Sequence, residues 1–201
     1  MTAPGMFPVN YLVSCYAGPM ARDAHATRQR LLDAATAEFA EHGIAGARVD
    51  RVAAAAGCNK ALIYSYFGNK DQLFEAVFAR DIAQFYELVP FDAGDLPGYA
   101  GRLFDHYETH PVTLRLSTWY RMERADVALP AVSAVNGVRL DRLRQAQADG
   151  SVPGHFDPVQ LLVLLQAVPA AWATTNPELA GSSSREFRRR TVVDAVRKLL
   201  A

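Results

Sequence analysis

Residues 49–67, VDRVAAAAGCNKALIYSYF, constrain the fold of this chain more than any other segment. Val52 and Ala56 share one face of a helix, and Ala53 is small where a second helix has to cross closely. Gly57 stands at the bend, where a positive φ is cheap only for glycine. This spacing predicts two short helices that cross steeply over a tight turn, the arrangement of a helix-turn-helix unit.

The second helix of this pair, expected over 60–67, starts with a lysine and contains no acidic residue. In a helix-turn-helix unit this helix enters the major groove of DNA by its N-terminal end, whose dipole favours phosphate. Tyr64 and Tyr66 can direct their hydroxyls outward to phosphate oxygens. Ala61 and Ser65 are small enough to let the helix approach the bases. We therefore expect DNA contacts from Thr27, Arg28, Arg48, Asn59, Lys60, Ala61, Leu62, Tyr64, Ser65, Tyr66 and Lys70.

The rest of the chain carries the signals of further helices, and no alternating strand pattern competes with them. Thr27 is placed to cap the first helix, and Gly43 is placed to end it. We expect helices over 27–42, 49–56, 60–67, 69–88, 96–109, 111–125, 131–148, 158–175 and 184–200. Capping boxes are expected at Asn69 with Gln72, Asp157 with Gln160, and Ser183 with Glu186. The chain is therefore predicted to be all-α.

Three parts are predicted along the chain. Residues 1–22 are expected to form a disordered leader, in which Met20 is a candidate for the true start. Residues 23–68 are expected to form a three-helix DNA-binding domain of the helix-turn-helix type. A linking helix joins it to a larger helical domain for ligand binding and dimerisation, residues 69–201, and the turn-rich stretch 89–98 is the expected seam.

Charge and cysteine content exclude several classes of protein. The chain has 21 basic and 21 acidic residues, so any electrostatic footprint of nucleic acid must be local. Half of the residues are apolar, which excludes global disorder. Cys15 and Cys58 make no disulfide framework, which favours a reduced, cytoplasmic setting. No run of about 18 apolar residues occurs, so we expect no membrane-spanning helix and no membrane partner.

The segment LLVLLQAVPAAWA at 161–173 is apolar nearly all round, so it must be covered on several faces. A second copy of the chain is the simplest cover, and the last helix would join it in a four-helix interface. The alternative is a central helix of a monomeric bundle, which is also apolar throughout. The residues expected at a homodimer interface are Leu162, Val163, Gln166, Val192, Val196 and Leu199.

Several large side chains of the C-terminal half carry a few polar groups, a combination that can line a ligand cavity. The same set can equally fill an ordinary core, because aromatic residues dominate both. The candidates for a ligand site are Phe104, Tyr107, Trp119, Tyr120, Met122 and Trp172.

The segments TRQRLLDAATAEFAEHG and RVDRVAAAAGCNKALIYSYFGNKDQLFEAVF, within about 27–78, resemble the N-terminal domain of the tetracycline-repressor (TetR) family of transcriptional regulators. The matched residues are Phe39, Gly43, Val49, Val52, Ala53, Ala56, Gly57, Leu62, Tyr64, Tyr66, Phe67, Lys70 and Leu73. The resemblance implies a two-domain all-α homodimer on palindromic or near-palindromic operator DNA. It also implies that the C-terminal domain binds a small molecule that weakens operator binding. From the bulky aromatic candidates we expect that effector to be apolar or amphipathic and the protein to be a repressor. One departure is Arg48, where the family often has a serine or threonine cap.

Two other classes of protein remain to be weighed. An enzyme lacks support, because the chain has no Walker loop, GxSxG, HExxH or cysteine–histidine arrangement. His106 and His110 are spaced for a metal ion, but further ligands would have to come from elsewhere, so we expect neither metal nor cofactor. A helical protein–protein adaptor is the second alternative. Salt distinguishes it, because binding through several phosphates falls steeply with salt and an apolar interface does not.

Overall fold

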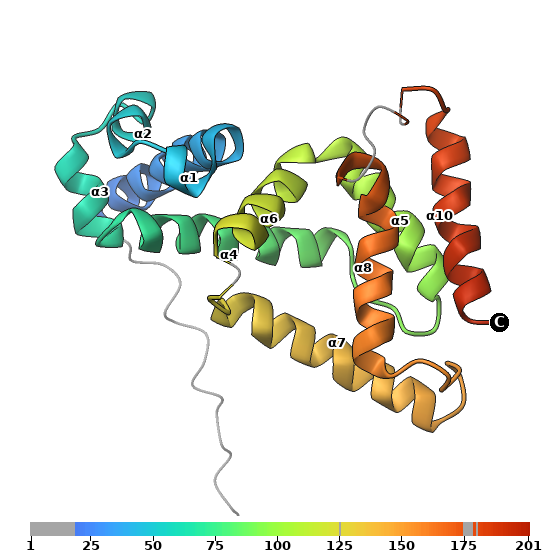
Figure 1. Ribbon diagram of the computed structural model, residues 1–201. Helices are drawn as coiled ribbons and strands as arrows, with labels where there is room; N and C mark the ends of the chain where they lie inside the picture. Colours follow the sequence, from blue (N-terminus) through green and yellow to red (C-terminus); the bar gives the residue numbers. More distant parts are fainter. Residues whose placement is uncertain (1–18, 125, 175–178, 180) are drawn as a thin grey trace, which may run out of the picture.

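The computed structural model describes residues 19–124, 126–174, 179 and 181–201. Within these ranges it contains helices and no strand, which confirms the predicted all-α fold (Figure 1). The helices are α1 (Pro19–Gly46), α2 (Val49–Ala55), α3 (Lys60–Phe67), α4 (Lys70–Leu88), α5 (Leu96–Thr109), α6 (Pro111–Glu123), α7 (Pro130–Ala148), α8 (Pro158–Thr174) and α10 (Arg185–Leu199).

The N-terminal helix begins earlier than the sequence predicted. Helix α1 starts at Pro19, so Thr27 lies inside it and the predicted cap at Thr27 is wrong. Proline suits a first helical position, and the alanine-rich residues after it continue the helix. The hydroxyl of Thr27 instead accepts a hydrogen bond of 3.2 Å from Nη2 of Arg30. The predicted leader, 1–22, therefore overlaps α1 at 19–22, and the rest of it lies outside the described residues.

Side-chain caps fix the starts of the later helices. The side chains of Asn59 and Asn69 accept hydrogen bonds from the backbone N–H groups of Ala61 and Gln72, as expected for N-caps. The box at 157–160 is also confirmed. The side chain of Asp157 accepts a hydrogen bond from the N–H of Val159 at 2.8 Å, and Oε1 of Gln160 accepts one from the N–H of Asp157 at 3.0 Å.

The cap of the last helix differs by one residue from the prediction. Ser184, and not Ser183, has extended backbone before α10, and its hydroxyl accepts from the N–H of Phe187 at 3.1 Å. The two serines are adjacent, so the sequence pattern alone did not distinguish them.

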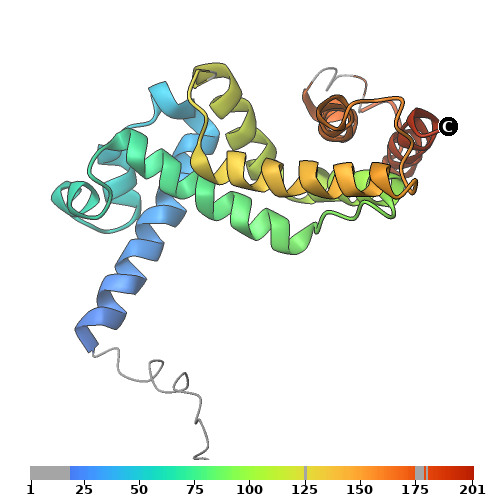
Figure 2. The ribbon, with the colours of Figure 1, turned by 90° about the horizontal axis from the view of Figure 1, so that it is seen from below.

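Two hydrophobic clusters organise the helices. The first packs α1, α2, α3 and the start of α4 against Leu116 of α6, and the second packs the end of α4 with α5, α7, α8 and α10. Helix α4 supplies Phe74 and Phe78 to the first cluster and Phe85 to the second. Figures 1 and 2 both place α1–α3, called the head below, at the opposite end of the molecule from α10. Helices α4 and α6 therefore join the head to the C-terminal half.

Gly43 makes the joint between the head and α6 possible. Its φ is +73°, which favours glycine, and an added Cβ would lie 2.5 Å from Oε1 of Glu123 and 2.9 Å from Cε3 of Trp119. We expect Gly43→Ala to lower the free energy of unfolding by about 2–5 kcal/mol, from backbone strain plus the clash. Urea unfolding measures this loss.

Gly57 provides the matched control. Its φ is +62°, but nothing lies within 4 Å of an added Cβ. Gly57→Ala should therefore cost only the backbone strain, about 1–2 kcal/mol. Equal losses for the two variants would show that the contact of Gly43 with α6 contributes nothing.

Candidate nucleic-acid interface and ligand pocket

Helix α3 divides into a buried face and an exposed face. Ile63 and Phe67 are buried against α1 and α2, whereas Leu62 is exposed. The exposed face carries Asn59, Lys60, Ala61, Leu62, Tyr64 and Ser65. These are residues expected to contact DNA, so the structure brings them together on one accessible surface. Their contact with DNA stays a prediction.

An ion pair holds the lysine at the start of α3. Nζ of Lys60 lies 2.8 Å from Oδ1 of Asp50 on α2. The hydrogen bond and charge of Lys60 lower the pKa of Asp50, and the same hydrogen bond raises the pKa of Lys60. The expected surface, acid-free along α3 itself, therefore has one carboxylate beside its first cation.

Three other residues expected to contact DNA, Lys70, Tyr66 and Arg28, make contacts within the head. Nζ of Lys70 donates to the backbone carbonyls of Ala45 and Ala47, at 3.0 and 3.3 Å, and so secures the end of α1 and the residue that follows it. The hydroxyl of Tyr66 donates to the carbonyl of Ala24 at 3.4 Å. The guanidinium of Arg28 lies 5.3 Å from the ring centre of Phe67. Lys70 and Tyr66 therefore already have structural roles in the head.

Arg48, which stands where the family often has a serine or threonine cap, makes no side-chain cap at the start of α2. Arg48 precedes α2 with extended backbone, and its side chain is exposed. Its backbone N–H donates to Oε1 of Glu38 at 2.7 Å, and the same carboxylate accepts from Arg51. Burial raises the pKa of Glu38, but the hydrogen bonds from Arg51 and Arg48 hold it below its usual value. The side chain of Arg48 is thus left at the surface of the head.

The end of α6 is bonded to the head. The carboxylate of Glu123 accepts hydrogen bonds from the N–H groups of Ile44 and Ala45, at 3.2 and 2.6 Å. The indole N–H of Trp119 donates to the carbonyl of Ala40 at 3.3 Å. Charged acceptors make stronger hydrogen bonds than neutral ones. Any displacement of α6 must therefore move the C-terminal end of α1 or break these bonds.

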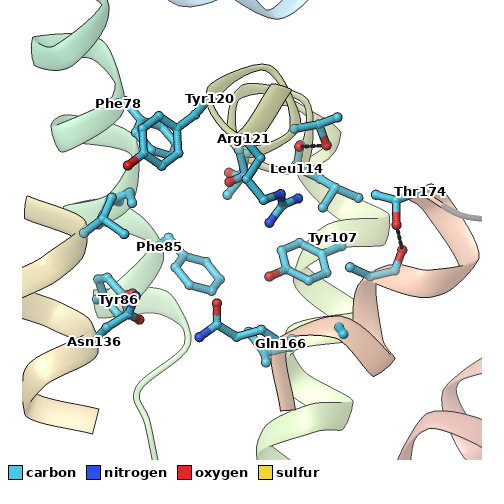
Figure 3. Close-up of a pocket in the computed structure, with 18 of the residues that line it drawn as sticks. Phe78, Phe85, Tyr86, Tyr107, Leu114, Tyr120, Arg121, Asn136, Gln166 and Thr174 are labelled. Atoms are coloured by element: carbon cyan, nitrogen blue, oxygen red, sulfur yellow. Dashed lines mark hydrogen bonds between the residues drawn. The ribbon is translucent and has the colours of Figure 1, made fainter. Parts of the chain in front are cut away.

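A pocket of about 620 Å³ lies between α4, α5, α6, α7 and α8 (Figure 3). This volume is in the range of small-molecule sites. The residues that line it are Phe78, Ile82, Phe85, Tyr86, Leu103, Tyr107, Thr113, Leu114, Ser117, Thr118, Tyr120, Arg121, Val132, Asn136, Arg139, Val163, Gln166, Ala167, Ala170 and Thr174.

The pocket includes two of the six residues expected at a ligand site, Tyr107 and Tyr120. The other four assignments are wrong. Phe104 and Trp172 belong to the C-terminal core, and Met122 is 70% exposed at the surface. Trp119 packs on the head instead of the pocket. The cavity and the core are therefore both present, and Phe78 and Phe85 belong to both.

The part of the pocket wall that α4 and α7 supply was not predicted from the sequence. Phe78, Phe85 and Tyr86 come from α4, which was considered only as a linking helix. Burial raises the pKa of the Tyr86 and Tyr107 phenols, and the positive charge of Arg139 opposes that rise. Both phenols therefore stay neutral and can donate hydrogen bonds. Arg139 was not singled out by the sequence, because α7 also contains Arg142 and Arg144.

The structure also corrects the expected dimer interface. Leu162, Val192 and Val196 are buried within the chain itself, in the core that joins α5, α8 and α10. Val163 and Gln166 line the pocket, and Leu199 is half-buried. The large apolar residues that α8 and α10 leave exposed are Val159, Val163 and Phe187, of which Val163 alone was expected at the interface.

Comparisons with known proteins agree with this arrangement. The model of bacterial regulatory proteins of the tetR family matches residues 31–77, and the model of the tetracyclin repressor-like C-terminal domain matches residues 95–198. The chain is 37% identical over 189 residues to the HTH-type transcriptional repressor SCO4008 of Streptomyces coelicolor. That match covers 90% of the chain and 98% of the relative. The chain belongs to the TetR family.

Further relatives support this placement of the TetR-family chain. The crystal structure of the regulator SCO4942 from Streptomyces coelicolor has a TM-score of 0.77 at 42% identity, and the match covers 86% of this chain and 97% of that one. The repressor NicS of Pseudomonas putida is 33% identical over 102 residues, which are 47% of this chain and 48% of NicS. As a TetR-family member, the chain is a DNA-binding transcriptional regulator.

None of the described helices has both the length and the apolar composition needed to cross a bilayer. Over the described residues, no three His, Cys, Asp or Glu side chains gather in a way that could hold a metal ion. The rings of His106 and His110 stack at 4.4 Å between centres.

Proposed function

We propose that this TetR-family regulator is a homodimeric repressor that a small apolar or amphipathic effector releases from a palindromic or near-palindromic operator. The observation that carries the proposal is the position of α6. Leu114, Tyr120 and Arg121 of this helix line the pocket, while Trp119 and Glu123 are bonded to the head. A molecule in the pocket therefore contacts the same helix that holds the DNA-binding surface.

The proposed release is mechanical. A ligand that displaces α6 would shift the head through Glu123 and Trp119, and α4 would carry the same shift because it also lines the pocket. Two heads that no longer match successive major grooves would lose the operator. The ligand must favour one of the two geometries, since equal affinity for both would shift nothing. By linkage, operator DNA must weaken ligand binding by the same factor.

The position of the exposed apolar residues supports a homodimer. The exposed apolar residues Val159 and Phe187 lie on α8 and α10, at the end of the molecule opposite the head (Figures 1 and 2). A dimer formed through this end would leave both heads free for DNA. Half-site centres should then lie about one helical turn apart or a modest multiple of it. The assignment of DNA binding to 23–68, and of ligand binding and dimerisation to 69–201, stays a prediction within this proposal.

The proposal is of a regulator and not of an enzyme or an adaptor. The family and the relatives of the chain are transcriptional regulators. The DNA partner would place the protein in the bacterial cytoplasm. An adaptor would use the exposed face of α3 for a helix, and its affinity for that helix would hardly depend on salt.

The ion pair at the start of α3 gives a first prediction for DNA binding. Lys60→Ala should weaken binding to all sequences by about tenfold and reduce the salt slope by about one, because it removes one phosphate contact and leaves Asp50 unpaired. Asp50→Asn should instead strengthen binding a few-fold, because it frees Lys60 and removes a negative charge near phosphate. Affinities at several salt concentrations measure both effects. If the two variants changed affinity in the same direction, this placement of the phosphate-facing surface would be wrong.

Release of the operator is tested by a screen. Compounds that raise the melting temperature of the protein are tested for loss of operator binding, in the wild type and in Glu123→Ala. We expect hits to weaken operator binding of the wild type about 5- to 150-fold, the usual range of coupling between sites. In Glu123→Ala the same hits should bind with unchanged affinity but release the operator poorly, because the bonds to Ile44 and Ala45 are gone.

The matched control for the screen is Glu87→Ala, an exposed glutamate of α4 that lines no part of the pocket. It should behave as the wild type. If pocket ligands stabilised the protein and left operator affinity unchanged in the wild type, the proposed release would be refuted. If Glu123→Ala released the operator as well as the wild type does, another route than α6 would carry the signal.

A further inference from the structure

Arg139 of α7 is a buried cation in the wall of the pocket. Its side chain is 3% exposed, and Nε and Nη2 have no hydrogen-bond partner. Over the described part of the chain, no carboxylate forms an ion pair with it. Burying an arginine without an acid or a hydrogen-bond acceptor is costly, and native proteins seldom leave such a group unpartnered.

Aromatic rings around Arg139 compensate for only part of this cost. Its guanidinium carbon lies 4.3 Å from the ring centre of Tyr86, and 5.7–6.0 Å from the ring centres of Phe85, Phe91 and Tyr99. Cation–π contacts of this kind stabilise the charge but accept none of its N–H bonds directly. The cage therefore holds a cation in the pocket wall and leaves its Nε and Nη2 without an acceptor.

The rest of the pocket has the same electrostatic sign. Arg121 is the other charged residue that lines it, and none of the described lining residues is acidic. Figure 3 shows the guanidinium of Arg121, the hydroxyl of Tyr107 and the amide of Gln166 turned toward the same space. Around these polar groups the wall is apolar, from residues such as Phe78 and Leu114.

We propose that the effector of this regulator is an amphipathic organic anion, whose anionic group binds at Arg139 and whose apolar body lies among the aromatic rings of α4 and α5. This inference rests on the proposed function, because it assigns a chemical class to the ligand of the same pocket. The anion supplies the acceptors that the guanidinium lacks, and arginine is the side chain best suited to bind them. A cationic ligand would meet two arginines and no acid.

A matched pair of fluorescent probes tests the charge preference without DNA. 8-Anilinonaphthalene-1-sulfonate carries a sulfonate, and N-phenyl-1-naphthylamine has the same ring system without it. We expect the wild type to bind the sulfonate at one site per chain, about 10- to 100-fold more tightly than the neutral probe, the range of a charge-assisted hydrogen bond. Equal affinities, or tighter binding of the neutral probe, would overturn the inference.

Variants locate the anion within the pocket. Arg139→Met should remove the preference for the sulfonate and keep affinity for the neutral probe, whereas Arg144→Met, an exposed arginine of the same helix, should change neither. The melting temperature of the free Arg139→Met protein should be unchanged or higher, because a buried group with unsatisfied donors is gone. A purely structural role for Arg139 predicts the opposite, a lower melting temperature with the preference retained in the folded fraction.

Arg121→Gln covers the case in which Arg139→Met does not fold. This exposed residue should weaken sulfonate binding several-fold and leave the neutral probe unaffected. Failure of the charge preference is distinguishable from failure of the proposed function. In the first case neutral compounds of the screen still release the operator, and in the second no pocket ligand of any charge does.

Discussion

Ala61→Glu is expected to weaken operator binding by at least about 100-fold, because a carboxylate would face the phosphates and base edges of the groove. Ala61 is exposed at the start of α3, and its backbone N–H is already capped by Asn59. An acid in the first turn of a helix is favoured by the helix dipole, so stability should be unchanged or slightly raised. Fluorescence anisotropy with labelled operator and a thermal melt measure the two effects.

The control for this variant is Ala83→Glu, an exposed alanine in the middle of α4. It adds the same charge outside the head and should leave operator affinity nearly unchanged. If Ala61→Glu bound the operator as well as Ala83→Glu does, α3 would not be the helix in the groove.

Phe187→Asp is expected to convert the proposed homodimer to monomers and to lower operator affinity by about 100- to 10,000-fold, because two linked heads bind a palindrome far more tightly than one. Phe187 is 53% exposed on α10 in the single chain, and a charge there would be left unpaired in an apolar interface. The position lies in the first turn of α10, where aspartate does not disturb the helix. Light scattering and operator titration measure the result.

Phe187→Leu keeps an apolar side chain and should stay dimeric. A wild-type protein that is monomeric at micromolar concentration would contradict the proposed assembly, and so would a dimeric Phe187→Asp. Val163 is less suitable for this test because it also lines the pocket. Val196→Glu should unfold the chain instead of separating subunits, because Val196 is fully buried in its own core.

The head was predictable because its determinants are local. Gly57 with its positive φ, the cap at Asn59 and the apolar residues that face α1 all lie within one short segment. The face of α3 follows directly from helical spacing, so the exposed residues around Lys60 and Tyr64 were foreseen. Lys70 and Tyr66 donate hydrogen bonds to carbonyls of α1, which are distant in the sequence, so only the folded chain shows these contacts.

The pocket was less predictable because it depends on which face each helix turns inward. Trp119 and Tyr120 are neighbours in sequence, yet one bonds to the head and the other lines the pocket. Val192 and Val163 were both expected at a dimer interface, but α10 packs on α5 and α8 within the chain and buries Val192. These outcomes depend on the packing of helices that are distant in the sequence, which periodicity does not specify.

The central claim is sequence-specific DNA binding by a dimer with α3 in the groove. Selection of bound DNA from a random pool is its most direct test. We expect the wild type to enrich one palindrome or near-palindrome, and its affinity for that site to fall steeply as salt rises. Ala61→Glu should enrich no site. Recovery of unrelated sequences by the wild type, or of the same site by Ala61→Glu, would contradict it.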